Sequence, residues 1–254
     1  MAQRLTGTAA LVTGASSGIG EAAAVALAAE GAAVALVARR RDRLDALAAR
    51  IEAGGGRALA IEADVTDRAQ ATEAVATAAA ELGRIDTVLN NAGVMLLGPV
   101  VDADLGEWER MLALNVQGLM YVAHAALPHL LAAAEDGPRQ VADLLNVSSV
   151  AGRVARSGSA VYNATKHAVG AFSEGLRQEV TQRHVRVSLI EPGAVDTELP
   201  DHNRPEILAH LRQRFADVER LRAEDIADAV AYVVTRPRHV AINELLVRPT
   251  QQQA

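Results

Sequence analysis

The chain has 254 residues, half of them hydrophobic and 2% aromatic, and its formal net charge is −6 at pH 7. It contains no cysteine, which excludes disulfides, thiolate metal sites and a cysteine nucleophile and agrees with a reducing cytoplasm. The acidic balance and scarce aromatic residues argue against a nucleic-acid surface, and no stretch predicts a signal peptide or a membrane span.

Apolar, β-branched runs alternate with Ala-rich stretches along the chain. The runs predict strands at residues 9–13, 33–37, 58–61, 87–90, 143–147, 186–190 and 244–247. The stretches between them predict helices at residues 19–30, 41–53, 68–82, 106–134, 160–183 and 224–235. This alternation is typical of an α/β fold: one Rossmann-type domain over residues 1–254, with a doubly wound seven-stranded parallel sheet and helices on both faces.

Two segments fall outside this alternation. Residues 135–141 predict a surface loop, and residues 192–218, rich in proline, charge and histidine, predict a long irregular lid over a substrate site at the strand ends. We expect residues 1–100 to bind mainly the cofactor.

The first predicted strand runs directly into a glycine-rich turn, TGASSGIG, and then into a helix. Gly14, Gly18 and Gly20 stand where the backbone must turn tightly, and the free N–H groups and dipole of the helix favour a pyrophosphate. Such a turn alone is a weak signal, because glycines also end strands and permit close packing. Its place inside a βαβ unit favours a dinucleotide site.

The end of the second strand, VALVARRR, bears on which dinucleotide is bound. An NAD site presents an acidic side chain at this point, whereas this chain has Arg39 and Arg40, whose guanidinium groups suit a 2′-phosphate. The alternative is a solvated basic run partly offset by Asp42. We favour NADP(H).

Of the 25 basic residues only Lys166 is a lysine, so the other 24 are arginines. A lone lysine can simply lie on a solvated face, but Lys166 follows Tyr162 by four residues in a helical stretch, which places both on one face. Tyrosine has a pKa of about 10, and a nearby ammonium favours the phenolate. The pair therefore predicts proton transfer at a substrate oxygen.

The strand before this helix ends in Ser148 and Ser149. A hydroxyl at this position can donate to a carbonyl oxygen as negative charge develops on it. The alternative is that these serines only cap the turn that follows the strand.

Together these motifs resemble the short-chain dehydrogenase/reductase family across nearly the whole chain. The matching runs are TGASSGIG, Asp64-Val65, NNAG, Asn115, Ser149, YNATK and Pro192-Gly193. The resemblance implies a catalytic tetrad: Tyr162 as acid/base, Ser149 holding the carbonyl, Lys166 also binding the nicotinamide ribose, and Asn115 placing a water. It also implies a set of cofactor contacts, namely Gly14, Ser16, Ser17, Gly18, Ile19, Gly20, Arg39, Arg40, Asp64, Val65, Asn91, Ala92, Gly93, Tyr162, Lys166, Pro192, Gly193, Val195 and Thr197.

We therefore expect reversible hydride transfer between NADP(H) and a small aldehyde, ketone or alcohol, with reduction favoured. Finer runs are similar to an NADPH-dependent aldehyde reductase and to NADP-dependent 3-hydroxy acid dehydrogenases, and the family implies a cytoplasmic homotetramer. Arg153, Arg156 and Arg204 indicate a substrate carboxylate or are surface charges. The rival hypothesis from another class is a catalytically silent NADPH-binding regulator.

A metal site is not expected. His124 with His129, and His202 with His210, lack the spacing of a closed zinc set, and core, surface or lid histidines explain them better.

Overall fold

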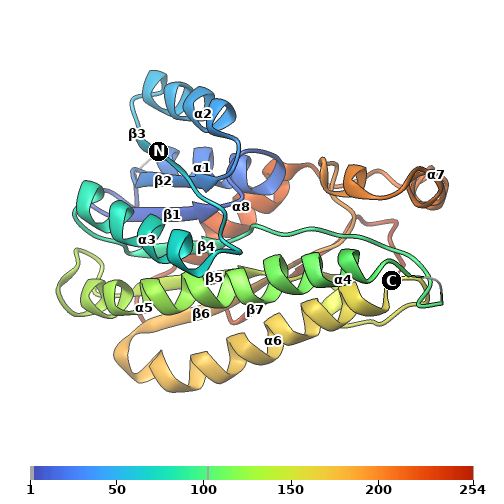
Figure 1. Cartoon of the computed structure of the whole chain (residues 1–254). Helices are drawn as coiled ribbons and strands as arrows, with labels where there is room; N and C mark the ends of the chain where they lie inside the picture. Colours follow the sequence, from blue (N-terminus) through green and yellow to red (C-terminus); the bar gives the residue numbers. More distant parts are fainter. Residues whose placement is uncertain (1–2, 102, 254) are drawn as a thin grey trace.

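The computed structural model describes residues 3–101 and 103–253, in which helices cover both faces of a parallel sheet (Figure 1). Within these residues the sheet has seven strands, ordered β3-β2-β1-β4-β5-β6-β7. The strands are β1 (Ala9–Thr13), β2 (Ala33–Ala38), β3 (Arg57–Glu62), β4 (Thr87–Asn90), β5 (Ala142–Val147), β6 (Val185–Pro192) and β7 (Glu244–Val247). Every neighbouring pair is parallel, so the predicted doubly wound sheet is confirmed.

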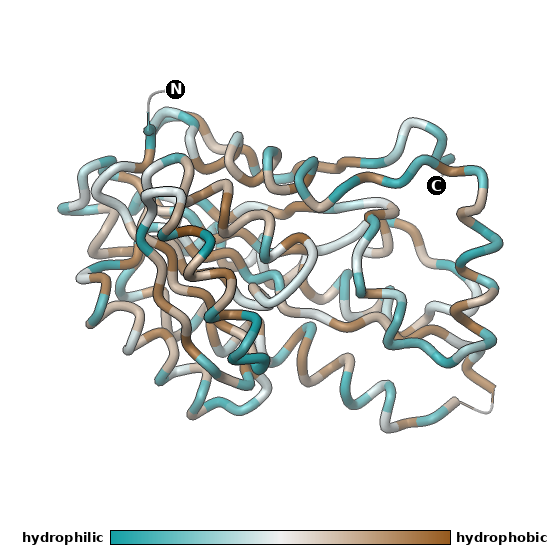
Figure 2. Tube along the Cα trace, turned by 90° about the horizontal axis from the view of Figure 1, so that it is seen from above, coloured by the Kyte–Doolittle hydropathy of each residue, from teal (hydrophilic) through white to brown (hydrophobic). Residues whose placement is uncertain are grey.

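Successive strand residues point to opposite faces of the sheet, and each face has its own core. On one face Val12 and Leu145 pack in a core with the helices α1 (Gly18–Ala29), α2 (Arg41–Ala53) and α8 (Ala223–Val234). On the other, Leu11 and Leu144 pack in a core with α3 (Arg68–Leu82), α5 (Leu119–Asp136) and α6 (Ala160–Val180). In Figure 2 the outer helices show alternating brown and teal residues, as amphipathic helices do.

The long helix expected over residues 106–134 is interrupted. The structure has α4 (Leu105–Leu112), a π-helical turn η1 (Ala113–Gly118) and then α5. The turn places Gly118 close to Val65, which lies in the segment after β3. A Cβ at Gly118 would lie 3.0 Å from the Val65 carbonyl oxygen. A π-turn inside a helix often marks a functional position, and this one contains Asn115.

The expectation of an irregular lid at 192–218 is wrong in part. The segment contains a short 3₁₀ turn η4 (Leu199–His202) and the helix α7 (Pro205–Arg214), which lies at the right edge of Figure 1. Pro205 at the first helical position has the φ that a helix needs, and Leu208 and Leu211 lie one turn apart on one face. The predicted loop at 135–141 also begins later than expected, because α5 continues to Asp136.

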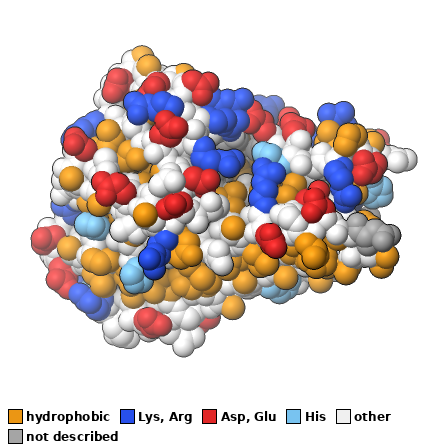
Figure 3. Space-filling view, viewed as in Figure 1, with side chains coloured by type: hydrophobic (Ala, Val, Ile, Leu, Met, Phe, Trp, Pro, Cys, Tyr) orange, Lys and Arg blue, Asp and Glu red, His pale blue; other side chains and the backbone are white. Residues whose placement is uncertain are grey.

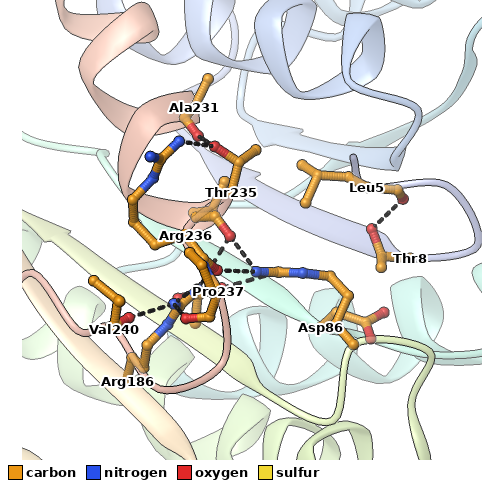
Figure 4. A network of polar contacts seen from close by, with 12 residues as sticks. Leu5, Thr8, Asp86, Arg186, Ala231, Thr235, Arg236, Pro237 and Val240 are labelled. Atoms are coloured by element: carbon orange, nitrogen blue, oxygen red, sulfur yellow. Dashed lines mark hydrogen bonds and ion pairs between the residues drawn. The ribbon is translucent and has the colours of Figure 1, made fainter. Parts of the chain in front are cut away.

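A buried arginine, Arg186, cross-links the structure at the amino ends of the strands. Arg186 on β6 pairs with Asp143 on β5, its Nε lying 2.7 Å from Oδ1. The same guanidinium donates to the carbonyl groups of Arg236, Pro237 and Val240 after α8 (Figure 4). This network lies at the amino ends of the strands and contributes to the stability of the fold. Among the described residues it makes no contact with the carboxyl ends of the strands. In the described part of the chain, no helix has both the length and the apolarity needed to cross a membrane.

Candidate active site

A cavity of about 660 Å³ opens at the carboxyl ends of the strands, beside α7. Figure 3 shows it as a hollow with basic side chains at its rim. All the sequence-predicted cofactor contacts line it except Gly20, and so do Ser149, Tyr162 and Lys166. The fold thus brings together residues that are far apart in the sequence, at the edge where doubly wound sheets bind ligands.

Tyr162 and Lys166 lie one turn apart on α6, and both are buried. The Lys166 ammonium nitrogen lies 5.9 Å from the centroid of the Tyr162 ring and donates to the Val147 carbonyl oxygen at 2.8 Å. Ser149 lies two residues after β5, where its Oγ donates to the Pro192 carbonyl at 3.4 Å and accepts from the Ala151 N–H at 3.1 Å. Its hydroxyl is close enough to the Tyr162 phenol to favour the phenolate form. One proton-donating group, one hydroxyl and one ammonium therefore meet in a single desolvated corner of the cavity.

Burial sets the protonation of this corner. It raises the pKa of Tyr162 to about 12, with the hydrogen bond from Ser149 acting in the opposite direction. It also lowers the pKa of Lys166 to about 8. The sequence-based expectation that the ammonium lowers the pKa of Tyr162 is therefore wrong for this structure, because desolvation of the phenolate dominates. At neutral pH Tyr162 is a neutral phenol and Lys166 is mostly charged.

Asn115 lies behind this corner, buried in the π-helical turn. Its Oδ1 accepts from the Val94 N–H at 2.8 Å, and its Nδ2 donates to the Val94 carbonyl at 2.8 Å and to Thr165 Oγ1 at 3.3 Å. These bonds fix the segment after β4 against α6. The role of Asn115 in placing a water stays a prediction.

The glycine-rich turn has the close approaches that its sequence predicts. Gly14 has φ of +66°, and a Cβ there would lie 2.9 Å from the Ala92 Cα atom. A Cβ at Gly20 would collide with the Gly14 carbonyl oxygen. Only glycine allows the start of α1 to approach the turn this closely, which leaves an open backbone cradle at the helix N-terminus. This cradle fits the pyrophosphate of a dinucleotide.

Thr13 is a residue that the sequence-based site missed. Its hydroxyl accepts from the backbone N–H groups of Asn91 and Ala92 at 3.0 and 3.1 Å. Asn91 returns the contact by donating its Nδ2 to the Thr13 carbonyl at 3.1 Å. These hydrogen bonds hold residues 91–93, which follow β4, against the end of β1. The only available signal was the position of Thr13 as the first residue of the turn.

The two predicted phosphate-binding arginines differ in their surroundings. Arg39 is exposed and lies 3.9 Å from Asp64, whereas Arg40 donates to Ser16 Oγ at 3.0 Å and to Ser17 Oγ at 2.7 Å. Arg40 is thereby attached to the glycine-rich turn.

Arg43 joins Arg39 and Arg40 in a basic cluster, and Glu198 pairs with that cluster. The sequence indicated neither Arg43 nor Glu198. Glu198 accepts from Arg40 at 2.9 Å and from Arg43 at 2.6 Å, and these hydrogen bonds lower the pKa of Glu198 to about 2. Glu198 stands 158 positions after Arg40. Only the fold brings this carboxylate of the predicted lid into contact with Arg40.

The segment after β6 closes the opposite side of the cavity. The Gly193 N–H donates to the Val247 carbonyl at 2.7 Å, and the Ala194 N–H donates to Gln252 Oε1 at 2.9 Å. Thr197 faces the glycine-rich turn, its Cγ2 lying 3.0 Å from the position of a Cβ at Gly18. The C-terminal tail therefore supports the segment predicted to bind the nicotinamide end, which the sequence did not indicate.

Several other candidates have structural roles. Ser148 donates to the Lys166 carbonyl at 3.2 Å, whereas the Ser149 hydroxyl is the one that acts on the pKa of Tyr162. Arg153 does not line the cavity, because it pairs with Glu191 and Glu244 on β6 and β7. Arg204 also lies outside the cavity lining, and it lies 3.5 Å from Glu107. Over residues 3–101 and 103–253, no group of three His or acidic side chains could hold a metal ion.

Comparisons with known proteins agree with this geometry. Residues 8–207 match the short chain dehydrogenase family. An uncharacterized oxidoreductase of Staphylococcus aureus is 36% identical over 96% of this chain and 98% of its own length. The closed form of serine dehydrogenase complexed with NADP⁺ is 33% identical and superposes with a TM-score of 0.88 over 97% of each chain. A family member from Burkholderia phymatum in complex with NAD is 26% identical, with a TM-score of 0.84 over 96% of this chain and 89% of its own.

Proposed function

Because the chain belongs to the short-chain dehydrogenase/reductase family of oxidoreductases, we propose that it transfers hydride between NADP(H) and a small carbonyl compound or alcohol. The observation that carries this proposal is the meeting of Tyr162, Ser149 and Lys166 in the cavity that also holds the open glycine cradle. Other family members carry NADP⁺ or NAD, so the choice of cofactor rests on this chain's own residues.

The basic cluster supports NADP(H). Arg40 is attached to Ser16 and Ser17 of the glycine-rich turn, and Arg39 stands exposed at the cavity rim. Two guanidinium groups beside a ribose site offer the forked donors that a 2′-phosphate accepts. Arg39 and Arg40 directly follow β2, where an NAD site presents an acidic side chain to the ribose 2′-hydroxyl.

The protonation of the site supports reduction as the favoured direction. The cofactor, when bound, supplies the hydride that reaches the carbonyl carbon. Ser149 donates a hydrogen bond to the carbonyl oxygen, and Tyr162, a neutral phenol at pH 7, gives its proton to that oxygen. The charged Lys166 then stabilises the phenolate that remains in the buried corner.

The test is a screen of aldehydes, ketones and β-ketoesters with NADPH and with NADH, following loss of the reduced cofactor. We expect turnover with NADPH to exceed turnover with NADH. A protein that binds NADPH but oxidises it with none of these compounds would instead be the silent regulator, and the proposed reaction would be wrong.

The finer assignments are also proposals. Runs such as VARR, NAGVMLLGPV and FSEGLRQEV are similar to clavulanic acid dehydrogenase, which favours a clavulanate-9-aldehyde-like substrate, and similar runs in NADP-dependent 3-hydroxy acid dehydrogenases favour that class as the alternative. The family resemblance supports a cytoplasmic location and a homotetramer. Light scattering of the purified protein tests the homotetramer.

A further inference from the structure

The lining of the active-site cavity includes arginines that the reaction chemistry above does not use. Arg156 comes from the turn that leads into α6, and Arg212 and Arg214 come from α7. Tyr162 and Ser149 line the same cavity. Figure 3 shows basic side chains facing the hollow beside α7.

Arg156 is held at a fixed place relative to the reacting corner. Its backbone N–H donates to Asn163 Oδ1 at 3.2 Å, and its carbonyl accepts from Ser159 Oγ at 3.0 Å. Asn163 directly follows Tyr162 on α6, and its Nδ2 donates to the carbonyls of Ala151 and Val154 at 2.8 and 2.9 Å. The turn that carries Arg156 is therefore attached to the helix that carries the phenol.

The guanidinium of Arg156 is partly buried and has no partner among the described residues. Its Nη2 is buried and makes no hydrogen bond within residues 3–101 and 103–253, and no carboxylate of those residues forms an ion pair with it. Arg153 and Arg204, by contrast, both contact glutamates. Burial, together with the charge of Arg214, lowers the pKa of Arg156. A buried donor nitrogen without a partner is costly, and an anion that accepts from Nη2 removes that cost.

We infer that Arg156, with Arg214 beside it, binds the carboxylate of the substrate, so that the preferred substrates are small oxo acids with an aldehyde or ketone at the other end. This inference rests on the proposed function. In the reaction the carbonyl carbon gains the hydride of NADPH and the oxygen gains the Tyr162 proton. The products are a hydroxy acid and NADP⁺, and Tyr162 recovers its proton from solvent.

The test compares kcat/KM for succinic semialdehyde with kcat/KM for its methyl ester, which is neutral and nearly the same size. A charge-assisted hydrogen bond corresponds to a preference of roughly 10- to 100-fold for the acid. Arg156→Gln should bring this ratio close to one, mainly through KM of the acid. Arg156→Lys, which keeps the charge without the fork, should give an intermediate ratio.

The matched control is Arg183→Gln. Arg183 lies in the 3₁₀ turn η3 (Thr181–Arg183), at the amino end of β6, and pairs with the exposed Glu135. This variant should keep the parental ratio, and NADPH binding measured by fluorescence shows whether each variant is folded.

Equal rates with the acid and the ester, or a ratio that survives Arg156→Gln, would overturn the inference and leave the proposed function standing. Turnover of neither compound by protein that still binds NADPH would instead refute the proposed function. A preference for 3-oxopropyl phosphonate over the semialdehyde would assign the site to phosphate and overturn the carboxylate assignment.

Discussion

Lys166→Met should make the protein without cofactor more stable while it removes activity. The pKa of Lys166 is lowered by burial from 10.5 to about 8, and at 1.36 kcal/mol per unit the charged form costs about 3 kcal/mol at pH 7. Methionine fills the same space without charge, but it leaves the Val147 carbonyl without its donor, which costs about 1 kcal/mol. The net gain is about 2 kcal/mol, or roughly 4–8 °C in Tm.

The pH dependence of this gain follows from proton binding. Between pH 8 and 10.5 the unfolded chain holds more protons on Lys166 than the folded chain does, so the stability of the parent rises with pH in this window. The cost of the charge should fall to roughly 1 kcal/mol at pH 10, and the advantage of Lys166→Met should shrink accordingly. Thermal unfolding at pH 7 and pH 10 measures both values. A variant less stable than the parent at pH 7, or an advantage that grows with pH, would refute the reasoning.

Three further predictions concern activity and cofactor choice. The reduction rate should fall above about pH 8, because Lys166 loses its charge there while Tyr162 remains a phenol to about pH 12, and a kcat/KM profile that is flat from pH 7 to 10 would contradict this. Arg39→Asp should reduce the preference for NADPH over NADH roughly 10- to 100-fold, because it removes a phosphate donor and adds repulsion, and unchanged kinetics with both cofactors would remove the 2′-phosphate assignment. Glu198→Gln frees Arg40 from its ion pair, so the Kd for NADPH should fall by up to about fivefold with little change for NADH, and weaker NADPH binding would show that Glu198 instead positions the arginine.

The sequence was sufficient to predict the strands of the sheet, because a buried parallel strand can be recognised from its local composition. Buried parallel strands read as β-branched runs wherever they occur, and the Ala-rich segments between them had enough length to read as helices. The helix α7 was missed because Leu211 is its only buried residue, in a segment rich in charge. The π-helical turn was missed because it depends on how Gly118 meets Val65, a contact that no local pattern records.

The candidate site divides in the same way. The spacing of Tyr162 and Lys166 and the glycine-rich turn are local patterns, and the structure places both in one cavity. The contact of Glu198 with Arg40 joins positions 158 apart, and the support of Ala194 by Gln252 joins positions 58 apart. The direction of the Tyr162 pKa shift also depends on burial, which is a property of the packed protein.

Tyr162→Phe tests the central claim most directly, because it removes one hydroxyl from a buried ring and leaves the ring in place. NADPH binding should persist with a similar Kd, while kcat for carbonyl reduction should fall by roughly 10²- to 10⁴-fold. Turnover equal to that of the parent, measured with protein that binds NADPH normally, would contradict the account.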